Sequence, residues 1–323
     1  MMVNTVTGAI APTALGLTLM HEHIIFGYPG YQGDVSLGGW DAERARTEVK
    51  TQVALAQSFG VKTLVDATPN ECGRDPEFLK AISEETGLQI VCATGYYYEG
   101  EGGTTYFKFR SALTDIAKEI YDMMMTEVTV GIGKTGIKAG VIKLASSKDV
   151  ITDYEKVFFL AGARVAQETG LPIITHTQEG TMGPAQARLL TEAGVPPNKI
   201  MIGHMDGNMN LAYHEETLAY GVRVAFDRCG IQMMVGMPFD NQRIDLFAQL
   251  VQKGYVERLH LSHDVICSWL GRPLEMPAPV AELMKNWHLG NVFQNILPGL
   301  QAQGLTDAQV RQIMVENPQA LFS

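Results

Sequence analysis

The chain has 323 residues, of which 46% are hydrophobic and 19% are charged, so it can bury a sizeable core and is not expected to be disordered. Its formal net charge is −10 and it has no cluster of Lys and Arg, which excludes the usual electrostatic signature of a nucleic-acid-binding protein and disfavours anionic membranes. The length suits one large domain or two ordinary ones.

The four cysteines form no C-x-x-C pair, and a chain of this length does not need disulfides for stability. The N-terminus has no basic region ahead of its apolar residues, and no apolar stretch approaches the ~20 residues that a membrane-spanning helix needs. We therefore expect a cytoplasmic protein with free thiols and no membrane association.

Eight short apolar runs recur along the chain, with helical patterns between them. The runs are rich in Val, Ile, Leu and Thr and nearly continuous, which is typical of parallel strands buried on both faces. They cover residues 16–24, 62–69, 89–97, 138–146, 172–178, 200–206, 223–229 and 259–265. Strands that alternate with helices form right-handed βαβ units, and eight such units predict a closed (β/α)8 TIM barrel, a single domain over residues 1–323.

Two helices between or after these strands carry clear end signals. Thr152 with Glu155 forms a capping box ahead of an apolar helical pattern. Thr306 with Gln309 repeats that signal for the last helix, which Pro318 is expected to stop.

Residues 131–136 match the G-x-G-x-x-G pattern of dinucleotide-binding loops. Such a loop must follow a strand and open a helix, whereas this one follows a predicted helix and precedes the strand at 138–146. We interpret it as a flexible connection and predict no nucleotide site there.

The first predicted strand ends in two histidines, His21 and His23. Because side chains in a strand alternate faces, both imidazoles project to one side and Glu22 projects to the other. Histidine is the commonest metal-binding side chain, so the pair could hold one cation. The H-x-H pattern alone is a weak signal, and a purely structural role is its alternative.

Later strands end in residues of the same chemistry, and the active site of a barrel lies at the C-terminal ends of its strands. A hydrogen-bonded core role would be favoured for any one of these histidines alone, but their joint placement predicts a metal centre. Asp264 could serve there both as a ligand and as a proton shuttle. The predicted ligands are His21, His23, Lys143, His176, His204 and Asp264.

Lys143 stands between Ile142 and Leu144 in a strand with no other charge. An isolated buried ammonium is costly and would normally lose its proton. A neutral amine could capture carbon dioxide as a carbamate, whose two oxygens could bridge two cations. The alternative is a lysine whose head extends to the barrel rim. Among so many histidines we favour the bridging ligand, an N6-carboxylysine at Lys143.

This ligand set resembles that of the binuclear amidohydrolase superfamily. The sequence segments around these ligands resemble those of one of its families, the phosphotriesterase-like lactonases, over essentially the whole chain. These segments are LMHEHI, GVKTLVDAT, KAGVIKLA, PIITHT, IGHMD, AFDRCG, LSHD and ENPQALFS. The resemblance implies a (β/α)8 barrel with two divalent metal ions, bridged by a carboxylated lysine and a hydroxide. Zinc is the favoured metal, and cobalt, manganese or iron are alternatives, because His, carboxylate and carbamate accept all of them.

The resemblance also implies residues that contact the substrate. Tyr97, in ATGYYY, matches the tyrosine whose hydroxyl points at the metal-bound substrate oxygen, and Arg228, in FDRCG, matches an arginine near the mouth. Their alternatives are a loop aromatic and an ion pair with the neighbouring aspartate. Trp269 belongs to the apolar stretch 265–279, which we interpret together with 231–239 as an acyl-chain channel. A subunit interface is an equal alternative for these stretches.

Two positions depart from the pattern of the family. After His204 the acidic residue, Asp206, stands one position away from its usual place, so a proton relay from Asp264 would be altered. Glu99 stands where related lactonases often have a second tyrosine, and a carboxylate there would disfavour anionic substrates.

We therefore expect a binuclear metal-dependent hydrolase that opens γ- or δ-lactones, N-acyl-homoserine lactones among them, by attack of a metal-bridging hydroxide, with promiscuous phosphotriesterase activity. Asp264 would carry the released proton, Lys143 would bridge the ions, and Tyr97 and Arg228 would orient the ring. A dedicated organophosphate triesterase or another ester hydrolase on the same centre is the nearest alternative, and a catalytically silent metal-binding barrel is the alternative of a different class. The expected partners are a small neutral lactone or ester and a second copy of the chain in a homodimer.

Overall fold

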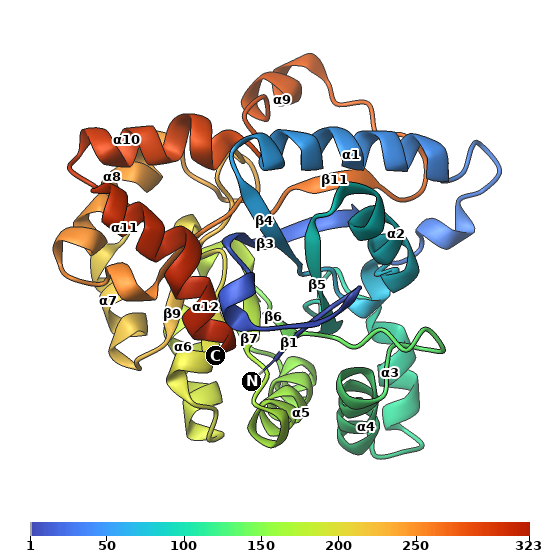
Figure 1. Ribbon diagram of the computed structural model, residues 1–323. Helices are drawn as coiled ribbons and strands as arrows, with labels where there is room; N and C mark the ends of the chain where they lie inside the picture. Colours follow the sequence, from blue (N-terminus) through green and yellow to red (C-terminus); the bar gives the residue numbers. More distant parts are fainter. Residues whose placement is uncertain (1) are drawn as a thin grey trace.

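A ring of parallel strands surrounded by helices forms the structure, a computed structural model that describes residues 2–323 (Figure 1). The predicted (β/α)8 TIM barrel is confirmed. Neighbouring strands pair in the order β10-β9-β8-β7-β6-β5-β4-β3-β11. The strands are β3 (Leu17–Phe26), β4 (Val61–Asp66), β5 (Gln89–Gly95), β6 (Val141–Ser146), β7 (Ile173–Thr177), β8 (Ile200–Ile202), β9 (Arg223–Phe226), β10 (Leu259–Leu261) and β11 (Ile266–Trp269).

The eighth strand position is divided between β10 and β11, whereas the sequence predicted one strand over 259–265. β10 pairs with β9 and β11 pairs with β3, so that the two segments together complete the ring. Between them, the His23 N–H donates to the carbonyl of Val265 at 2.8 Å, and the Asp264 N–H donates to the carbonyl of His21 at 3.1 Å. The single-strand prediction was wrong because Asp264 has a left-handed backbone, with φ 55°, which an extended strand does not contain.

Helices follow most strands, and an antiparallel hairpin of β1 (Val3–Thr5) and β2 (Gly8–Ile10) precedes the barrel. Both predicted capping boxes are present, at the starts of α5 and α11. The prediction that Pro318 stops the last helix was wrong. A π-helical turn, Gln312–Glu316, continues α11 into α12, and Pro318 occupies the first turn of α12. The helices are α1 (Ala42–Ser58), α2 (Pro76–Thr86), α3 (Thr104–Ser111), α4 (Ile116–Thr129), α5 (Asp153–Thr169), α6 (Gly183–Glu192), α7 (Leu211–Ala219), α8 (Asp240–Gln252), α9 (Ala278–Leu283), α10 (Leu297–Ala302), α11 (Asp307–Arg311) and α12 (Asn317–Phe322).

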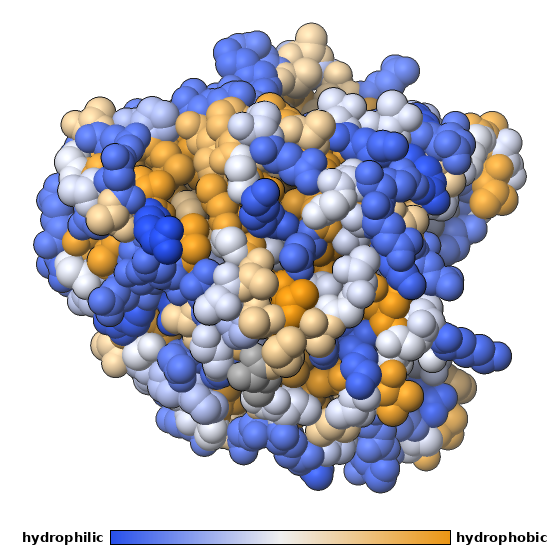
Figure 2. Space-filling view, in the orientation of Figure 1, coloured by the Kyte–Doolittle hydropathy of each residue, from blue (hydrophilic) through white to orange (hydrophobic). Residues whose placement is uncertain are grey.

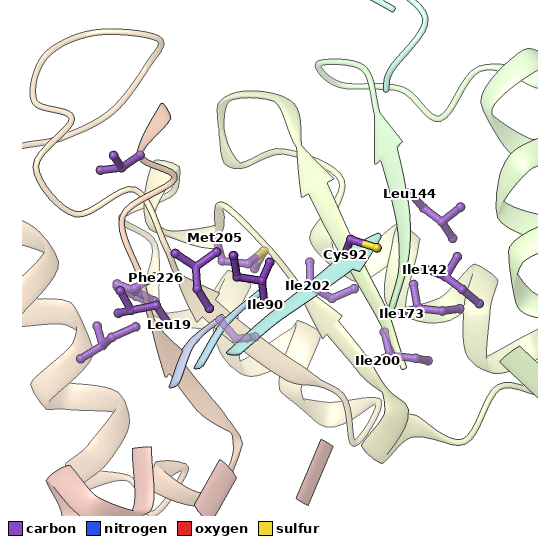
Figure 3. Close-up of a cluster of buried hydrophobic side chains, with 14 of the residues drawn as sticks. Leu19, Ile90, Cys92, Ile142, Leu144, Ile173, Ile200, Ile202, Met205 and Phe226 are labelled. Atoms are coloured by element: carbon purple, nitrogen blue, oxygen red, sulfur yellow. The ribbon is translucent and has the colours of Figure 1, made fainter. Parts of the chain in front are cut away.

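The strands carry two apolar layers, one under the helices and one inside the ring. Figure 3 shows part of the outer layer: Leu19, Ile90, Cys92, Ile142, Leu144, Ile173, Ile200, Ile202, Met205 and Phe226. The inner layer includes Val65, Ala93, Ile174 and Met201. Because successive strand side chains alternate faces, Lys143 is directed inward while both of its neighbours pack under the helices.

The two termini lie close together on one face of the barrel (Figure 1). Leu15, Leu321 and Phe322 from this face pack into the inner apolar layer and so close the floor of the barrel. Figure 2 shows that hydrophilic side chains dominate this face, with apolar residues in small groups. Because apolar side chains close this end of the barrel, the polar cluster described below lies towards the other end of the ring.

Within residues 2–323, none of the helices combines the length and apolarity needed to cross a bilayer.

Candidate active site

The barrel brings all six predicted ligands together at one end, and each of them is buried. His21 Nε2 lies 3.6 Å and His23 Nε2 lies 3.0 Å from Asp264 Oδ1. His204 Nε2 lies 3.8 Å from the other carboxylate oxygen, Oδ2. Residues distributed over more than 240 positions of the chain thus form one compact polar cluster.

His176 and Lys143 complete this cluster. The rings of His176 and His204 lie 4.6 Å apart, as do the rings of His21 and His204. Lys143 Nζ lies 2.7 Å from His21 Nε2. Gly95 is the register partner of Lys143, and a Cβ at Gly95 would lie 1.8 Å from the Lys143 carbonyl oxygen. Only glycine therefore allows β5 to pass so close to the lysine.

Local backbone irregularities direct three of these side chains into the cluster. The register between β3 and β4 shifts between Leu19 and Glu22, next to His21, and such irregularities re-aim side chains near active sites. His204 and Asp264 each have φ 55°, which is uncommon for residues other than glycine. Strained conformations of this kind persist where the surrounding structure over-determines them, as at functional sites.

Asp227 supports the cluster from outside, a role that the sequence did not predict. His21 Nδ1–H donates to Asp227 Oδ2 at 2.7 Å, and His204 Nδ1–H donates to Oδ1 at 2.9 Å. The His204 backbone N–H also donates to Oδ1, at 2.6 Å. These bonds direct both Nε2 atoms towards the cluster, as outer partners of metal-binding histidines do. An acidic residue at the end of the seventh predicted strand was the available signal.

Thr68 supports His23 in the same way. His23 Nδ1–H donates to Thr68 Oγ1 at 2.8 Å, and the Thr68 hydroxyl donates onward to the carbonyl of Ile25 at 3.3 Å. Three of the predicted histidine ligands thus have their Nδ1 atoms bound by the protein.

Burial determines the charge states of the cluster. It lowers the pKa of His21, lowers that of His204 to about 3, and lowers that of His176 well below its ordinary value, so these imidazoles are neutral at physiological pH. Burial alone would raise the pKa of Asp264, but the adjacent imidazoles and the Arg228 guanidinium hold it well below its usual range. Neutral imidazoles beside an ionised carboxylate are a donor set that a divalent cation such as zinc can bind.

Two groups of donors are close enough to surround a cation. One ligand atom from each of His21, His23 and Asp264 lies within 4.8 Å of the others, and the same holds for His21, His204 and Asp227. In the second group the Asp227 oxygens already accept hydrogen bonds from the Nδ1 atoms. We therefore interpret Asp227 as a support for the ligands and the first group as a fit for a metal ion.

A cavity of about 390 Å³ opens onto the cluster, within the range of roughly 300–1,000 Å³ that small-molecule sites occupy. Both Tyr97 and Arg228 line it. The Tyr97 ring lies 4.8 Å from the His176 ring. Arg228 Nε donates to Asp264 Oδ2 at 2.9 Å, so its ion-pair partner is Asp264 rather than the neighbouring aspartate. Among the residues described, buried Arg228 Nη1 has no hydrogen-bond partner.

An apolar wall forms most of the rest of the cavity, which Glu101, Gln178 and Glu275 also line. Trp269 lies on it, with its ring 6.2 Å from Tyr28 and 5.9 Å from Phe26. Only some residues of the two predicted channel stretches line the cavity, because Met233 and Phe239 are exposed and do not line it. The segment around α9 also contributes to the wall, which the sequence did not predict. The apolar lining residues include Phe26, Ile231, Met234, Val235, Ile266, Trp269, Leu274, Met276, Pro277, Val280, Met284 and Trp287.

The two departures from the family pattern lie outside the ligand cluster. The Glu99 carboxylate pairs with Lys108 and does not line the cavity. Contrary to the prediction from the sequence, Glu99 therefore cannot disfavour anionic substrates by direct contact. Asp206 Oδ2 accepts from the Arg228 N–H at 3.2 Å and from Arg243 Nε at 2.8 Å. The displaced acidic residue therefore contacts the arginine that in turn holds Asp264.

Comparison with known proteins places these features in a family. The model of the Phosphotriesterase family matches residues 1–322. The aryldialkylphosphatase of Saccharolobus solfataricus is 34% identical over 312 residues, which cover 96% of this chain and 95% of that protein. The structure of the organophosphorus hydrolase from Deinococcus radiodurans superposes with a TM-score of 0.98 at 57% identity, covering 100% of this chain and 97% of that chain.

A further solved structure, described as molecular engineering of organophosphate hydrolysis activity from a weak promiscuous lactonase template, is 55% identical. It superposes with a TM-score of 0.98 and covers 100% of both chains. With its barrel, its buried histidine cluster and these matches, the chain belongs to the phosphotriesterase family of hydrolases.

Proposed function

We propose that this enzyme hydrolyses lactones at a binuclear metal centre and that it hydrolyses phosphotriesters as a side activity. The observation that carries the proposal is the asymmetry of the cavity. One end holds the polar cluster with Tyr97 and Arg228, and the rest is mainly an apolar wall, with Glu101, Gln178 and Glu275 also among the lining residues. A lactone has one carbonyl, one ring leaving group and one tail, which this shape fits. A phosphotriester has three substituents around phosphorus and needs a pocket for each.

The donor set supports two metal sites. His21, His23 and Asp264 would hold one divalent ion, and His176 and His204 would hold the other, with zinc favoured and cobalt, manganese or iron as alternatives. Such ions, when bound, would polarise the ester carbonyl and lower the pKa of water.

Lys143 would join the two sites as a carboxylated lysine. Its amine is fully buried, and its hydrogen-bonding contact is His21 Nε2 rather than a carboxylate. Burial lowers the pKa of Lys143 to about 8, so a fraction of the amine is neutral near pH 7 and able to capture carbon dioxide.

The remaining residues would handle the proton and the substrate. Asp264 is ionised and can accept the proton released in the attack and deliver it to the leaving alkoxide oxygen. Burial raises the pKa of Tyr97 well above its ordinary value, so its hydroxyl stays protonated and can donate to a substrate oxygen. The unpartnered Nη1 of Arg228 can donate to a second substrate oxygen.

A dedicated organophosphate triesterase is the second candidate. The names of two relatives favour it, since one is an aryldialkylphosphatase and another an organophosphorus hydrolase. The lactonase template among the solved structures favours the first candidate.

A kinetic screen of metal-replete enzyme separates the two candidates. We expect kcat/KM for at least one γ- or δ-lactone to exceed that for paraoxon-type triesters by ~10²-fold or more, a difference of ~2.7 kcal/mol in transition-state stabilisation. Asp264→Asn enzyme purified in parallel reports any contaminating esterase. A broad lactone panel without turnover, alongside efficient triester hydrolysis by the same preparation, would refute the proposal.

We also propose a homodimer. Val35 and Leu37, which lie between β3 and α1, are exposed apolar residues of the kind that mark protein interfaces. Analytical ultracentrifugation of the wild type and of a Val35→Ser, Leu37→Ser variant tests this, and a wild-type monomer at micromolar concentration would contradict it. The expected cytoplasmic location stays a prediction, which the four free, buried thiols support.

A further inference from the structure

Glu22 lies between the two histidines of β3, and its fully buried side chain accepts four hydrogen bonds. Glu22 Oε1 accepts from the Ser262 hydroxyl at 2.8 Å, from the His263 backbone N–H at 3.0 Å and from His263 Nδ1–H at 2.7 Å. Glu22 Oε2 accepts from the Val265 N–H at 2.7 Å. One carboxylate of the first strand thus binds residues on both sides of Asp264, which lies in the gap between β10 and β11.

The same contacts continue into the surrounding structure. The Ser262 hydroxyl accepts from the His21 N–H at 3.1 Å, which links the serine to the first predicted ligand. His263 Nε2 accepts from the Val292 N–H at 3.0 Å, so both ring nitrogens of His263 are bound. The carbonyl of His263 accepts from the Trp287 indole at 3.1 Å, and Trp287 lines the cavity.

These bonds account for the conformation of Asp264. A left-handed aspartate is strained, and it persists only where neighbouring contacts over-determine it. The Asp264 side chain itself faces the cluster and makes no bond to Glu22. The residues on either side of it are held instead, by four buried hydrogen bonds that end on one group, two from backbone N–H groups and two from side chains.

We propose that Glu22 is a positioning residue that holds Asp264, and with it the metal site of β3, in the geometry needed for hydrolysis. This inference rests on the proposed role of Asp264 as ligand and proton acceptor. Glutamine at position 22 would keep the volume but replace one acceptor oxygen by an amide that donates. Because all four partners are donors, at least one donor would then face another donor, and the segment around Asp264 would be released.

Glu155 provides a matched control for this substitution. It is also buried, and it accepts four hydrogen bonds, of which three end on Oε1 and one on Oε2. Its partners are Glu99, Ser147 and Thr152, and it does not line the cavity. Glu22→Gln and Glu155→Gln therefore each remove one acceptor oxygen from a buried carboxylate that accepts four hydrogen bonds. Only Glu22 is adjacent in sequence to predicted metal ligands.

The first measurement is the rate at which enzyme loaded with two zinc ions loses metal to a chelator. We expect Glu22→Gln to release zinc at least 10-fold faster than the wild type, and Glu155→Gln to stay within 3-fold of it. Equal release rates from the two variants would overturn the proposal. If Glu22→Gln does not fold, Ser262→Ala removes one of the four bonds and should release zinc 2- to 5-fold faster, and a wild-type rate from Ser262→Ala would overturn the proposal instead.

The second measurement is a double-mutant cycle at saturating zinc, with the best ester substrate found. Glu22→Gln should lower kcat at least 10-fold with KM within 3-fold, but it should change kcat less than 3-fold in an Asp264→Asn background. A merely structural defect would reduce kcat by the same factor in both backgrounds, and that result overturns the proposal. If Asp264→Asn alone keeps wild-type kcat, the proposed proton-accepting role of Asp264 fails, whereas the zinc-release comparison still decides the role of Glu22.

Discussion

Asp227→Asn is the substitution whose effect on metal binding follows most directly from the structure. The carboxylate accepts from two imidazole N–H groups, those of His21 and His204, and from one backbone N–H. Asparagine has one acceptor oxygen and one donor amide. In either orientation of the amide, its NH2 group faces one of the two Nδ1–H groups. That histidine must then rotate or take the other tautomer, which places a proton on the Nε2 atom that faces the cluster.

The expected loss follows from the number of ligands affected. One of the predicted ligands loses its orientation while the others keep theirs, and loss of such an outer partner typically weakens metal binding by about 10–100-fold, or ~1.4–2.7 kcal/mol. Competition with a chelator at fixed pH measures this as the free metal concentration at half-occupancy. Excess metal should restore part of the activity of the variant, because the ligand atoms themselves are still present.

The comparison needs a variant that loses a buried carboxylate elsewhere. Glu155→Gln serves, since Glu155 caps α5 and is buried without touching the cluster. The free metal concentration at half-occupancy of Glu155→Gln should match that of the wild type. Asp227→Asn protein that binds metal within 3-fold of the wild type would refute the reasoning that Asp227 orients the histidines.

Three further predictions concern the predicted site residues. Lys143→Ala should lose metal and activity, and short carboxylates with added metal should restore part of the activity; a fully active Lys143→Ala enzyme would exclude the bridging role. Asp264→Asn should lower kcat by ~10²–10⁴-fold with a much smaller change in KM at matched metal content, because an amide cannot accept the proton. A variant within a few-fold of the wild type would remove Asp264 from the proton path. Trp269→Ala should change the preference for tail length in a series of acyl lactones without abolishing hydrolysis of tailless ones, and an unchanged preference would assign this wall to another role.

Much of the fold and of the cluster could be predicted from the order of residues along the chain. Apolar runs separated by helical patterns specify parallel strands, and a parallel barrel brings the C-terminal ends of all strands to one side. A polar residue at each of several strand ends therefore had to converge on the others. The alternation of side chains along a strand was enough to direct Lys143 inward, with Ile142 and Leu144 under the helices.

Tertiary structure alone decided how that cluster is held and what surrounds it. Asp227 reaches His21 across 206 positions of sequence, and Glu22 reaches His263 across 241. Neither partnership leaves a local pattern, because each depends on how strands far apart in the sequence are placed in the ring. The left-handed backbone of Asp264, which divides the eighth strand, likewise arises from contacts on both of its sides. The cavity wall includes α9 for the same reason: an apolar segment outside the strand pattern contributes to a site only where the chain folds back over it.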